Sequence, residues 1–358
     1  MVLHITHNDA DALGCALVLD FFSKDEMFSV HKNEEVKHYF CRIGTQDEIL
    51  LNALDEYQDY ISRIIISDIS ISKETASKVM EFLEKHPYAG LDNYDHHNTN
   101  PNKDEKWCIV TEEAGGHKIA ACKIMFNIFK HVYHVSPIDM RRYESYVFLL
   151  YIIERISAYD TWEWRNNPYK YAIPDTMENM PIDIEEDFTT VLIQMLGIES
   201  AYNLLKKRLY TTSYDLKVLV DPIKLYGDEL TSLYFAKKAK DKEDVDNAIK
   251  NVRVIKNCSE FNNLNIAIFI QDRGNPSIIG NKIVTDYPYV DLVVILFINS
   301  KTISLRSDES KVDCSVIAKE RGGGGHPGAS GFKATDDDEI LKYINLYFST
   351  KEYLIQED

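Results

Sequence analysis

Eight side chains in the first half of the sequence are of the types that hold divalent metal ions. They are His7, Asp9 and Asp11, then Asp68, then the consecutive Asp95, His96 and His97, and finally Asp160. If their four segments converge on one crevice, they can hold a pair of ions, because one carboxylate bridges the ions while others neutralise their charge. The mixture of imidazole and carboxylate favours Mn²⁺ over Mg²⁺, which prefers an all-oxygen shell.

A second candidate site lies near the C-terminus, where Gly322, Gly323, Gly324 and Gly325 are followed by His326. Backbone amides without side chains in the way can cradle an anion, and the histidine adds a donor. A flexible linker is the alternative interpretation of a glycine run. We reject it because patterns typical of strands and helices flank the run on both sides.

Each metal-competent segment also has a purely structural interpretation. The H-x-D-x-D segment is compatible with a helix N-cap, and an aspartate after a strand is usually a turn residue. Consecutive histidines occur on loops, and Asp160 alone carries no information. The functional interpretation is favoured because all of these segments occur together in one chain.

The elements that must position these side chains alternate between strands and helices. Apolar or alternating runs at 2–6, 63–67 and 91–94 predict strands, and helical spacing predicts helices at 12–22, 73–85, 115–134 and 140–158. Such alternation predicts an α/β fold with a parallel sheet, in which ligands collect beyond the carboxyl ends of the strands. The polar segments after the three strands fall at those ends.

The chain is long enough for two domains. We predict a parallel-sheet domain with flanking helices over 1–187, ending in an acidic segment with two prolines at 174–187. A helical connector is expected over 188–250, followed by a smaller α/β domain over 251–358. In that second domain we predict strands at 266–270, 290–298 and 302–306, and helices at 313–320 and 338–348.

The chain resembles the DHH/DHHA1 phosphoesterase superfamily in the order of its motifs. These are HNDAD, a strand-end aspartate, DHH, a later aspartate and GGGGHPGASG. The size resembles its nanoRNase or oligoribonuclease branch, which is related to RecJ-type exonucleases. The resemblance implies a catalytic DHH domain and a substrate-binding DHHA1 domain. One departure is Ala12, where the family usually has glycine directly after the second aspartate of the first motif.

The resemblance also implies roles for individual residues. His7 and Asp9 would bind one metal ion, Asp11, His96 and Asp160 a second, and Asp68 would bridge the two. Asp95 would orient its neighbouring histidine, and His97 would lie near the scissile phosphate. The implied catalytic residues are therefore Asp68, Asp95 and His97, and the implied substrate-binding residues are Arg306, Gly323, Gly324, Gly325 and His326.

Composition limits the partners. Lys+Arg 40 against Asp+Glu 57 gives a net charge of −17, which disfavours duplex DNA because phosphate binding needs clustered cations. The sequence contains no basic stripe with interleaved aromatic residues, which would have indicated a groove for a long strand.

The six cysteines form no C-x-x-C pair, and the polar N-terminus does not resemble a signal peptide. The longest apolar stretch, 290–298, is too short to span a membrane. We therefore expect a cytoplasmic protein, and a homodimer stays open.

The expected function is hydrolysis of short RNA or DNA oligonucleotides, about two to five nucleotides long, to mononucleotides by water activated between two metal ions. Mn²⁺ is the expected metal, with Mg²⁺ or Co²⁺ as alternatives. The same centre is compatible with cyclic mononucleotides, linear dinucleotides or 3′-phosphoadenosine 5′-phosphate. A single-strand exonuclease, a pyrophosphatase and a non-catalytic nucleotide-binding module rank below these.

Overall fold

The computed structural model describes residues 1–23, 35–132, 140–161, 163, 188–210, 236–237, 239–271 and 275–354. The chain divides into two compact units, Met1–Asp228 (unit 1) and Glu229–Asp358 (unit 2). The predicted connector, 188–250, therefore falls in both units, and the acidic segment 174–187 lies outside the described residues. The assignment of separate roles to 1–187, 188–250 and 251–358 stays a prediction.

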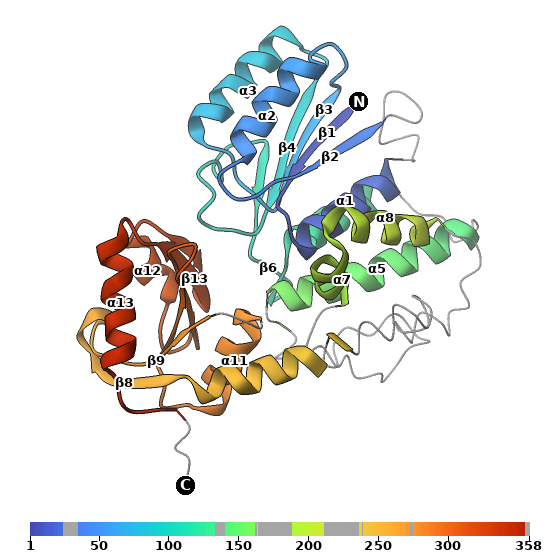
Figure 1. Cartoon of the computed structure of the whole chain (residues 1–358). Coiled ribbons are helices and arrows are strands. Elements are labelled where there is room, and N and C mark those ends of the chain that lie inside the picture. The colour runs from blue at the N-terminus through green and yellow to red at the C-terminus, as the bar shows by residue number, and fades with distance from the viewer. Residues whose placement is uncertain are drawn as a thin grey trace. The chain divides into compact units, whose positions relative to one another are not determined.

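Unit 1 is built on a parallel sheet, as predicted (Figure 1). In its described part, five strands pair in the order β2-β1-β3-β4-β5, and every pairing is parallel. The strands are β1 (Val2–Thr6), β2 (Val36–Phe40), β3 (Arg63–Ser67), β4 (Gly90–Asp95) and β5 (Cys108–Val110). Because neighbouring parallel strands end at the same edge, residues after β1, β3 and β4 are brought close together.

Helices cover both faces of this sheet. On one face, α2 and α3 cover a core that contains Leu3, Ile5, Ile64 and Ile66. On the other face lies α1, which is buried along its whole length and also packs against α4, α5 and α8. The helices of unit 1 are α1 (Ala10–Phe22), α2 (Gln46–Tyr57), α3 (Lys73–Lys85), α4 (Ala121–Val132), α5 (Met140–Asp160), α7 (Phe188–Leu196) and α8 (Ile198–Leu209).

One predicted helix begins later than expected. Instead of starting at 115, α4 starts at Ala121, because β6 (Glu113–Ala114) and β7 (His117–Lys118) form a small hairpin before it. Gly115 and Gly116 form its two-residue turn with φ of 62° and 79°. Two consecutive positive φ angles are the requirement of the tight hairpin turn that glycine pairs favour. The Gly-Gly pair therefore forms a hairpin turn and does not begin the helix that was predicted to start at 115.

Unit 2 contains a mixed sheet in the order β12-β13-β11-β10-β9-β8, among the residues described. β9 and β10 are parallel and are joined through α11, whereas the other pairings are antiparallel. The strands are β8 (Arg253–Cys258), β9 (Leu264–Ile270), β10 (Leu292–Phe297), β11 (Thr302–Ser307), β12 (Gly324–His326) and β13 (Ala329–Lys333). A short 3₁₀ turn, η1 (Ser259–Phe261), follows β8.

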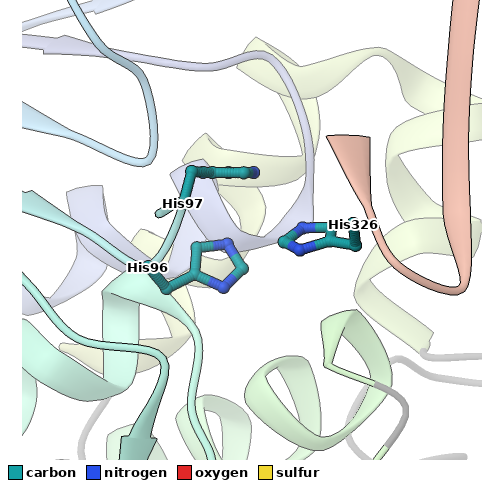
Figure 2. A group of neighbouring side chains, drawn as sticks. All are labelled: His96, His97 and His326. Carbon is teal, nitrogen blue, oxygen red and sulfur yellow. The ribbon is translucent and has the colours of Figure 1, made fainter. Parts of the chain in front are cut away.

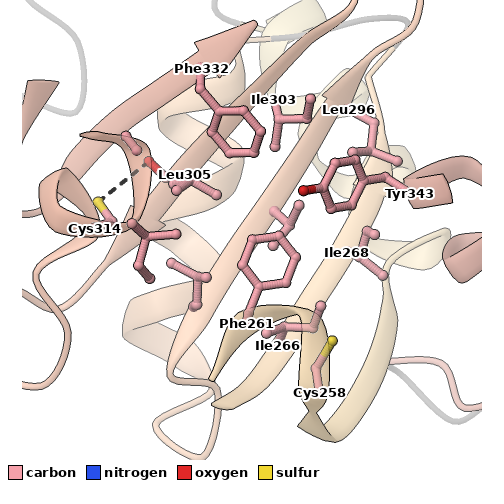
Figure 3. Packing of buried hydrophobic residues seen from close by; sticks show 14 of the residues in the cluster. Cys258, Phe261, Ile266, Ile268, Leu296, Ile303, Leu305, Cys314, Phe332 and Tyr343 are labelled. Carbon is pink, nitrogen blue, oxygen red and sulfur yellow. Dashed lines mark hydrogen bonds between the residues drawn. The ribbon is translucent and has the colours of Figure 1, made fainter. Parts of the chain in front are cut away.

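The buried apolar residues of unit 2 form two cores, one on each face of its sheet. One core, drawn in Figure 3, gathers Phe261, Phe332 and Tyr343 with the aliphatic side chains of one sheet face. The other core contains Phe269 and includes residues of the helical stretch 239–250. The remaining helices are α11 (Pro276–Asp286), α12 (Cys314–Lys319) and α13 (Asp337–Ser349). No helix in the described part of the chain is long and apolar enough to cross a membrane.

Candidate metal centre

The predicted metal ligands of unit 1 converge at the carboxyl edge of its sheet. His7 and Asp9 follow β1, Asp68 follows β3, and Asp95 ends β4 just before His96. The remaining members of the set are Asp11 in the first turn of α1 and Asp160 at the end of α5. Four segments that are distant in sequence thus meet in one place, as the alternation of strands and helices predicted.

The first group of side chains is His7, Asp9 and Asp68. His7 Nδ1 lies 2.6 Å from Asp9 Oδ2 and 3.7 Å from Asp68 Oδ2. Asp9 is also the N-cap of α1, since its other oxygen accepts a hydrogen bond from the Ala12 amide at 3.1 Å. Although burial opposes it, the hydrogen bond with His7 lowers the pKa of Asp9 to about 2. The helix-cap interpretation is therefore correct for Asp9, and it coexists with a place in the cluster.

The second group is Asp11, His96 and Asp160. His96 Nε2 lies 3.3 Å from Asp160 Oδ2 and 3.7 Å from Asp11 Oδ2. The same nitrogen lies 3.4 Å from Asp68 Oδ1. Asp68 therefore directs one oxygen toward each group, which is the geometry that a bridging carboxylate needs.

Asp68 shows that this cluster is built for positive charge. Burial, followed by the charges of Asp9, Asp11 and Asp160, raises the pKa of Asp68 well above its usual value. Its Oδ2 is buried and accepts no hydrogen bond from the residues that the structure describes. Buried carboxylates of like charge are stable together only when a cation or protons compensate them. The donor set thus fits divalent cations.

Asp11 has a structural role that the sequence did not reveal. Its two carboxylate oxygens accept hydrogen bonds from the amides of Ala121 and Cys122, each at 2.8 Å. These are the first two residues of α4, so Asp11 caps a helix 110 residues away along the chain. Each carboxylate oxygen has a second lone pair, which leaves Asp11 able to contact a metal ion as well.

Asp95 orients His97. Its Oδ1 lies 2.7 Å from His97 Nδ1 and accepts the His97 amide at 3.0 Å, while its Oδ2 accepts a hydrogen bond from Asn100 Nδ2 at 2.8 Å. Burial lowers the pKa of His97, but the bond to Asp95 and nearby carboxylates outweigh it and raise that pKa to about 9. Figure 2 shows the His97 ring beside that of His96, with centroids 4.3 Å apart.

Asn100 is a site residue that the sequence interpretation missed. Its side chain is buried and fixes the oxygen of Asp95 that His97 does not use. We expect Asn100→Ala to reduce turnover about 10- to 100-fold, the usual effect of losing a partner that orients a site residue. Steady-state kinetics and thermal unfolding would be compared with Asn98→Ala, since Asn98 is an exposed residue of the same loop. Equal activity of the two variants would contradict the assignment.

Arg306, a predicted substrate-binding residue of unit 2, is held beside the N-terminus of α11. Its guanidinium donates to Ser304 Oγ at 2.8 Å and to Ser277 Oγ at 3.0 Å. Gly280 makes this possible, because a Cβ at that position would lie 2.7 Å from Arg306 Cγ. A guanidinium and the positive end of a helix dipole both favour an anion at this place.

The glycine run has a structural explanation for most of its members. Gly322, with φ of 73°, and Gly323 donate their amides to Lys319 and Ala318, which ends α12 in a Schellman motif. Cβ atoms added to Gly323 and Gly325 would lie 2.1 Å and 2.6 Å from carbonyl oxygens of β13, whereas one on Gly324 meets nothing within 4 Å. The Gly322 and Gly323 amides are thus committed to the helix end, so the predicted cradle is narrower than expected. Binding of substrate by Gly323, Gly324, Gly325 and His326 stays a prediction.

Comparisons with known proteins give a relative whose similarity spans most of the chain. No protein-family model matches the chain. The chain is 24% identical to oligoribonuclease NrnB of Bacillus subtilis (strain 168) over 341 residues, which cover 93% of this chain and 72% of that protein. A similarity of that extent must include both units. It confirms the resemblance to a phosphoesterase family that the motifs indicated.

Solved structures resemble the chain at low sequence identity. The pGpG-specific phosphodiesterase PggH of Vibrio cholerae has a TM-score of 0.48 and 13% identity, covering 98% of each chain. An exopolyphosphatase-related protein of Bacteroides fragilis has a TM-score of 0.47 and 16% identity, covering 97% of this chain and 91% of that one.

Proposed function

We propose that this chain, a hydrolytic phosphoesterase related to the DHH/DHHA1 superfamily, uses two divalent metal ions to cleave phosphodiester bonds in short oligonucleotides. The observation that carries the proposal is the pair of histidine–carboxylate groups that share Asp68. Two sets of ligands with a common carboxylate suit two neighbouring ions and a phosphate between them. The similarity to an oligoribonuclease supports the choice of a nucleotide phosphodiester.

Each residue of the centre would have a distinct task. His7 and Asp9 would hold one ion, Asp11, His96 and Asp160 the other, and Asp68 both. When bound, the ions supply an activated water and neutralise charge on the phosphate and the leaving oxygen. The chain itself contributes His97, whose ring is oriented by Asp95 at its Nδ1 and which would bind a phosphate oxygen or donate a proton.

Mn²⁺ is the metal we propose, because imidazole nitrogens belong to both groups and Mg²⁺ prefers oxygen. Mg²⁺ and Co²⁺ are the alternatives. The net charge of −17 favours short substrates over long strands, because a long polyanion needs an extended cationic surface. RNA and DNA oligonucleotides are both compatible with the centre. From the sequence we predict that the protein is cytoplasmic and that it binds neither duplex DNA nor a membrane. A homodimer is compatible with the sequence.

A product assay tests this function. The protein would receive 5′-phosphorylated RNA of two, three, five and about twenty-four nucleotides, with and without Mn²⁺. We expect the shortest RNAs to be cleaved fastest, since charge repulsion grows with length, and a chelator to abolish cleavage. Cyclic AMP, a linear dinucleotide, 3′-phosphoadenosine 5′-phosphate and pyrophosphate serve as competing substrates. Preference for one of these would keep the metal centre and change the substrate, whereas metal binding without any turnover would contradict an enzyme.

A further inference from the structure

A continuous series of buried polar side chains crosses the sheet of unit 1 on its α1 face. His4 and His38 are paired in register on β1 and β2, and their Nδ1 atoms lie 2.7 Å apart. The other ring nitrogen of His4 lies 2.8 Å from the hydroxyl of Ser67 on β3. His4 and Ser67 are fully buried. Three neighbouring strands are therefore linked by side chains as well as by their backbone hydrogen bonds.

The outer end of this series reaches α1 and α8. His38 Nε2 lies 3.5 Å from Asp20 Oδ1 on α1. Asp20 accepts hydrogen bonds from the Tyr202 hydroxyl and from Lys206, whose Nζ lies 3.0 Å from Oδ2. Burial opposes ionisation of Asp20, but these partners, His38 foremost, lower its pKa. The Asp20 carboxylate, which lies next to the His38 ring, is therefore ionised.

His4 contacts both neighbouring strands through its two ring nitrogens. Burial, together with the charge of His38, lowers the pKa of His4 well below its usual value, so His4 is neutral and has one N–H. A neutral imidazole donates from one ring nitrogen and accepts at the other. His4 therefore donates to one of its two partners, His38 Nδ1 and the Ser67 hydroxyl, and accepts from the other.

The inner end of the series is the carboxyl end of β3. Ser67 is the last residue of the strand, and its carbonyl and hydroxyl both lie 2.9 Å from Thr6 Oγ1. The next residue, Asp68, has a φ of 54°, in the left-handed region that costs an L-residue free energy. Such a conformation persists only where the surrounding structure fixes it. Ser67 is fixed from two sides immediately before that turn.

We propose that His4, His38 and Asp20 are positioning residues that act through Ser67 to hold Asp68 between the two groups of the metal centre. This inference rests on the proposed function of Asp68 as the bridging carboxylate. Packing alone does not require polar residues here, because Val2 and Ile65, also buried on these strands, are apolar. Apolar side chains of similar volume would fill the same space. Buried imidazoles and a carboxylate that bind one another also fix the orientation of each side chain.

The test compares variants that interrupt the series with one that only weakens packing. His4→Phe keeps an aromatic ring but removes both hydrogen bonds, and Ser67→Ala removes only the hydroxyl. Val2→Ala is the control, because Val2 lies on the same strand and face as His4 but at the end away from the centre. Mn²⁺ affinity would be measured by titration calorimetry, beside kcat, KM and thermal unfolding of the full chain.

We expect His4→Phe and Ser67→Ala each to weaken Mn²⁺ affinity roughly tenfold and to lower kcat with little change in KM. The double variant should be no worse than the more impaired single variant, because both interrupt one series. Ser67→Thr should bind Mn²⁺ more tightly than Ser67→Ala and about as tightly as the wild type, since threonine keeps the hydroxyl. Val2→Ala should lower thermal stability and leave Mn²⁺ affinity unchanged.

The inference is overturned if His4→Phe and Ser67→Ala bind Mn²⁺ as tightly as the wild type, or if Val2→Ala weakens binding equally. Should His4→Phe fail to fold, Ser67→Ala and Ser67→Thr decide alone. Failure of the proposed function gives a different result, because the wild type itself would then not bind Mn²⁺ or would not cleave any phosphodiester.

Discussion

Asp68→Asn should abolish turnover and at the same time make the metal-free protein more stable. Loss of a partner that merely orients a ligand costs about 10- to 100-fold, so loss of the shared carboxylate should cost at least about a thousandfold in kcat. The gain in stability follows from burial, because Asp68 is surrounded by Asp9, Asp11 and Asp160, which raise its pKa. The neutral amide removes that repulsion while keeping the shape of the side chain.

The pH dependence of stability gives a sharper check. In the unfolded chain the pKa of Asp68 is near 3.8, and in the folded, metal-free protein it is higher, so the folded state binds more protons between the two values. Stability of the wild type therefore falls as pH rises through that interval, and this loss is fully present above the folded pKa. The Asn variant lacks this contribution, so its advantage in unfolding free energy should grow with pH and should shrink when Mn²⁺ is added to both proteins.

The choice of asparagine matters because of the backbone. Asp68 has a φ of 54°, which asparagine tolerates, whereas alanine there costs roughly 1 to 2 kcal/mol. Asp68→Ala would therefore mix the loss of a carboxylate with backbone strain. We expect it to be inactive as well, but less stable than Asp68→Asn. Near-normal activity of the Asn variant would contradict the two-metal proposal, and lower stability at every pH would contradict the account of the buried charge.

Much of the centre could be predicted because its information is local. The strands 2–6 and 63–67 were predicted with the bounds that the structure has, since short apolar runs between polar segments are unambiguous there. Parallel strands end at one edge, so the residues after each strand converge without any knowledge of side-chain contacts. That topological rule alone predicts that His7, Asp68 and His96 lie close together.

The missed features depend on contacts between distant segments. Asp11 caps α4 from 110 residues away, and Asn100 supports Asp95 only because the loop after β4 folds back. Neither residue type predicts such a partner. The series from Asp20 through His4 to Ser67 is similar, because an isolated histidine in a strand is indistinguishable from an ordinary core residue until the register of β1 against β2 is known.

The glycine run illustrates how one pattern can have two explanations. Four consecutive glycines suggested an anion cradle, but three of them are needed for local structure. Gly322 ends α12 in a left-handed conformation, and Gly323 and Gly325 allow β12 to approach β13 closely. Gly324 has no such constraint, which makes it the position where a binding role can be separated from folding.

Gly323→Ala should therefore destabilise unit 2, whereas Gly324→Ala should not. A Cβ at position 323 would lie 2.1 Å from the carbonyl oxygen of Gly331 and 2.6 Å from Phe332 Cβ, so the paired strands must move apart. Overpacking that forces the backbone to shift typically costs about 1 to 3 kcal/mol. At position 324 the same methyl group meets nothing within 4 Å, and a change within about 0.5 kcal/mol is expected.

Denaturant unfolding of the full chain, combined with KM for a dinucleotide, separates folding from binding at this loop. A stable Gly324→Ala variant with a raised KM would support contact between the glycine run and substrate, because the added methyl group obstructs only the open side of β12. An unchanged KM would restrict the run to its structural role and leave Arg306 as the anion-binding candidate of unit 2. If Gly323→Ala were as stable as the wild type, the close approach of β12 to β13 would itself be wrong.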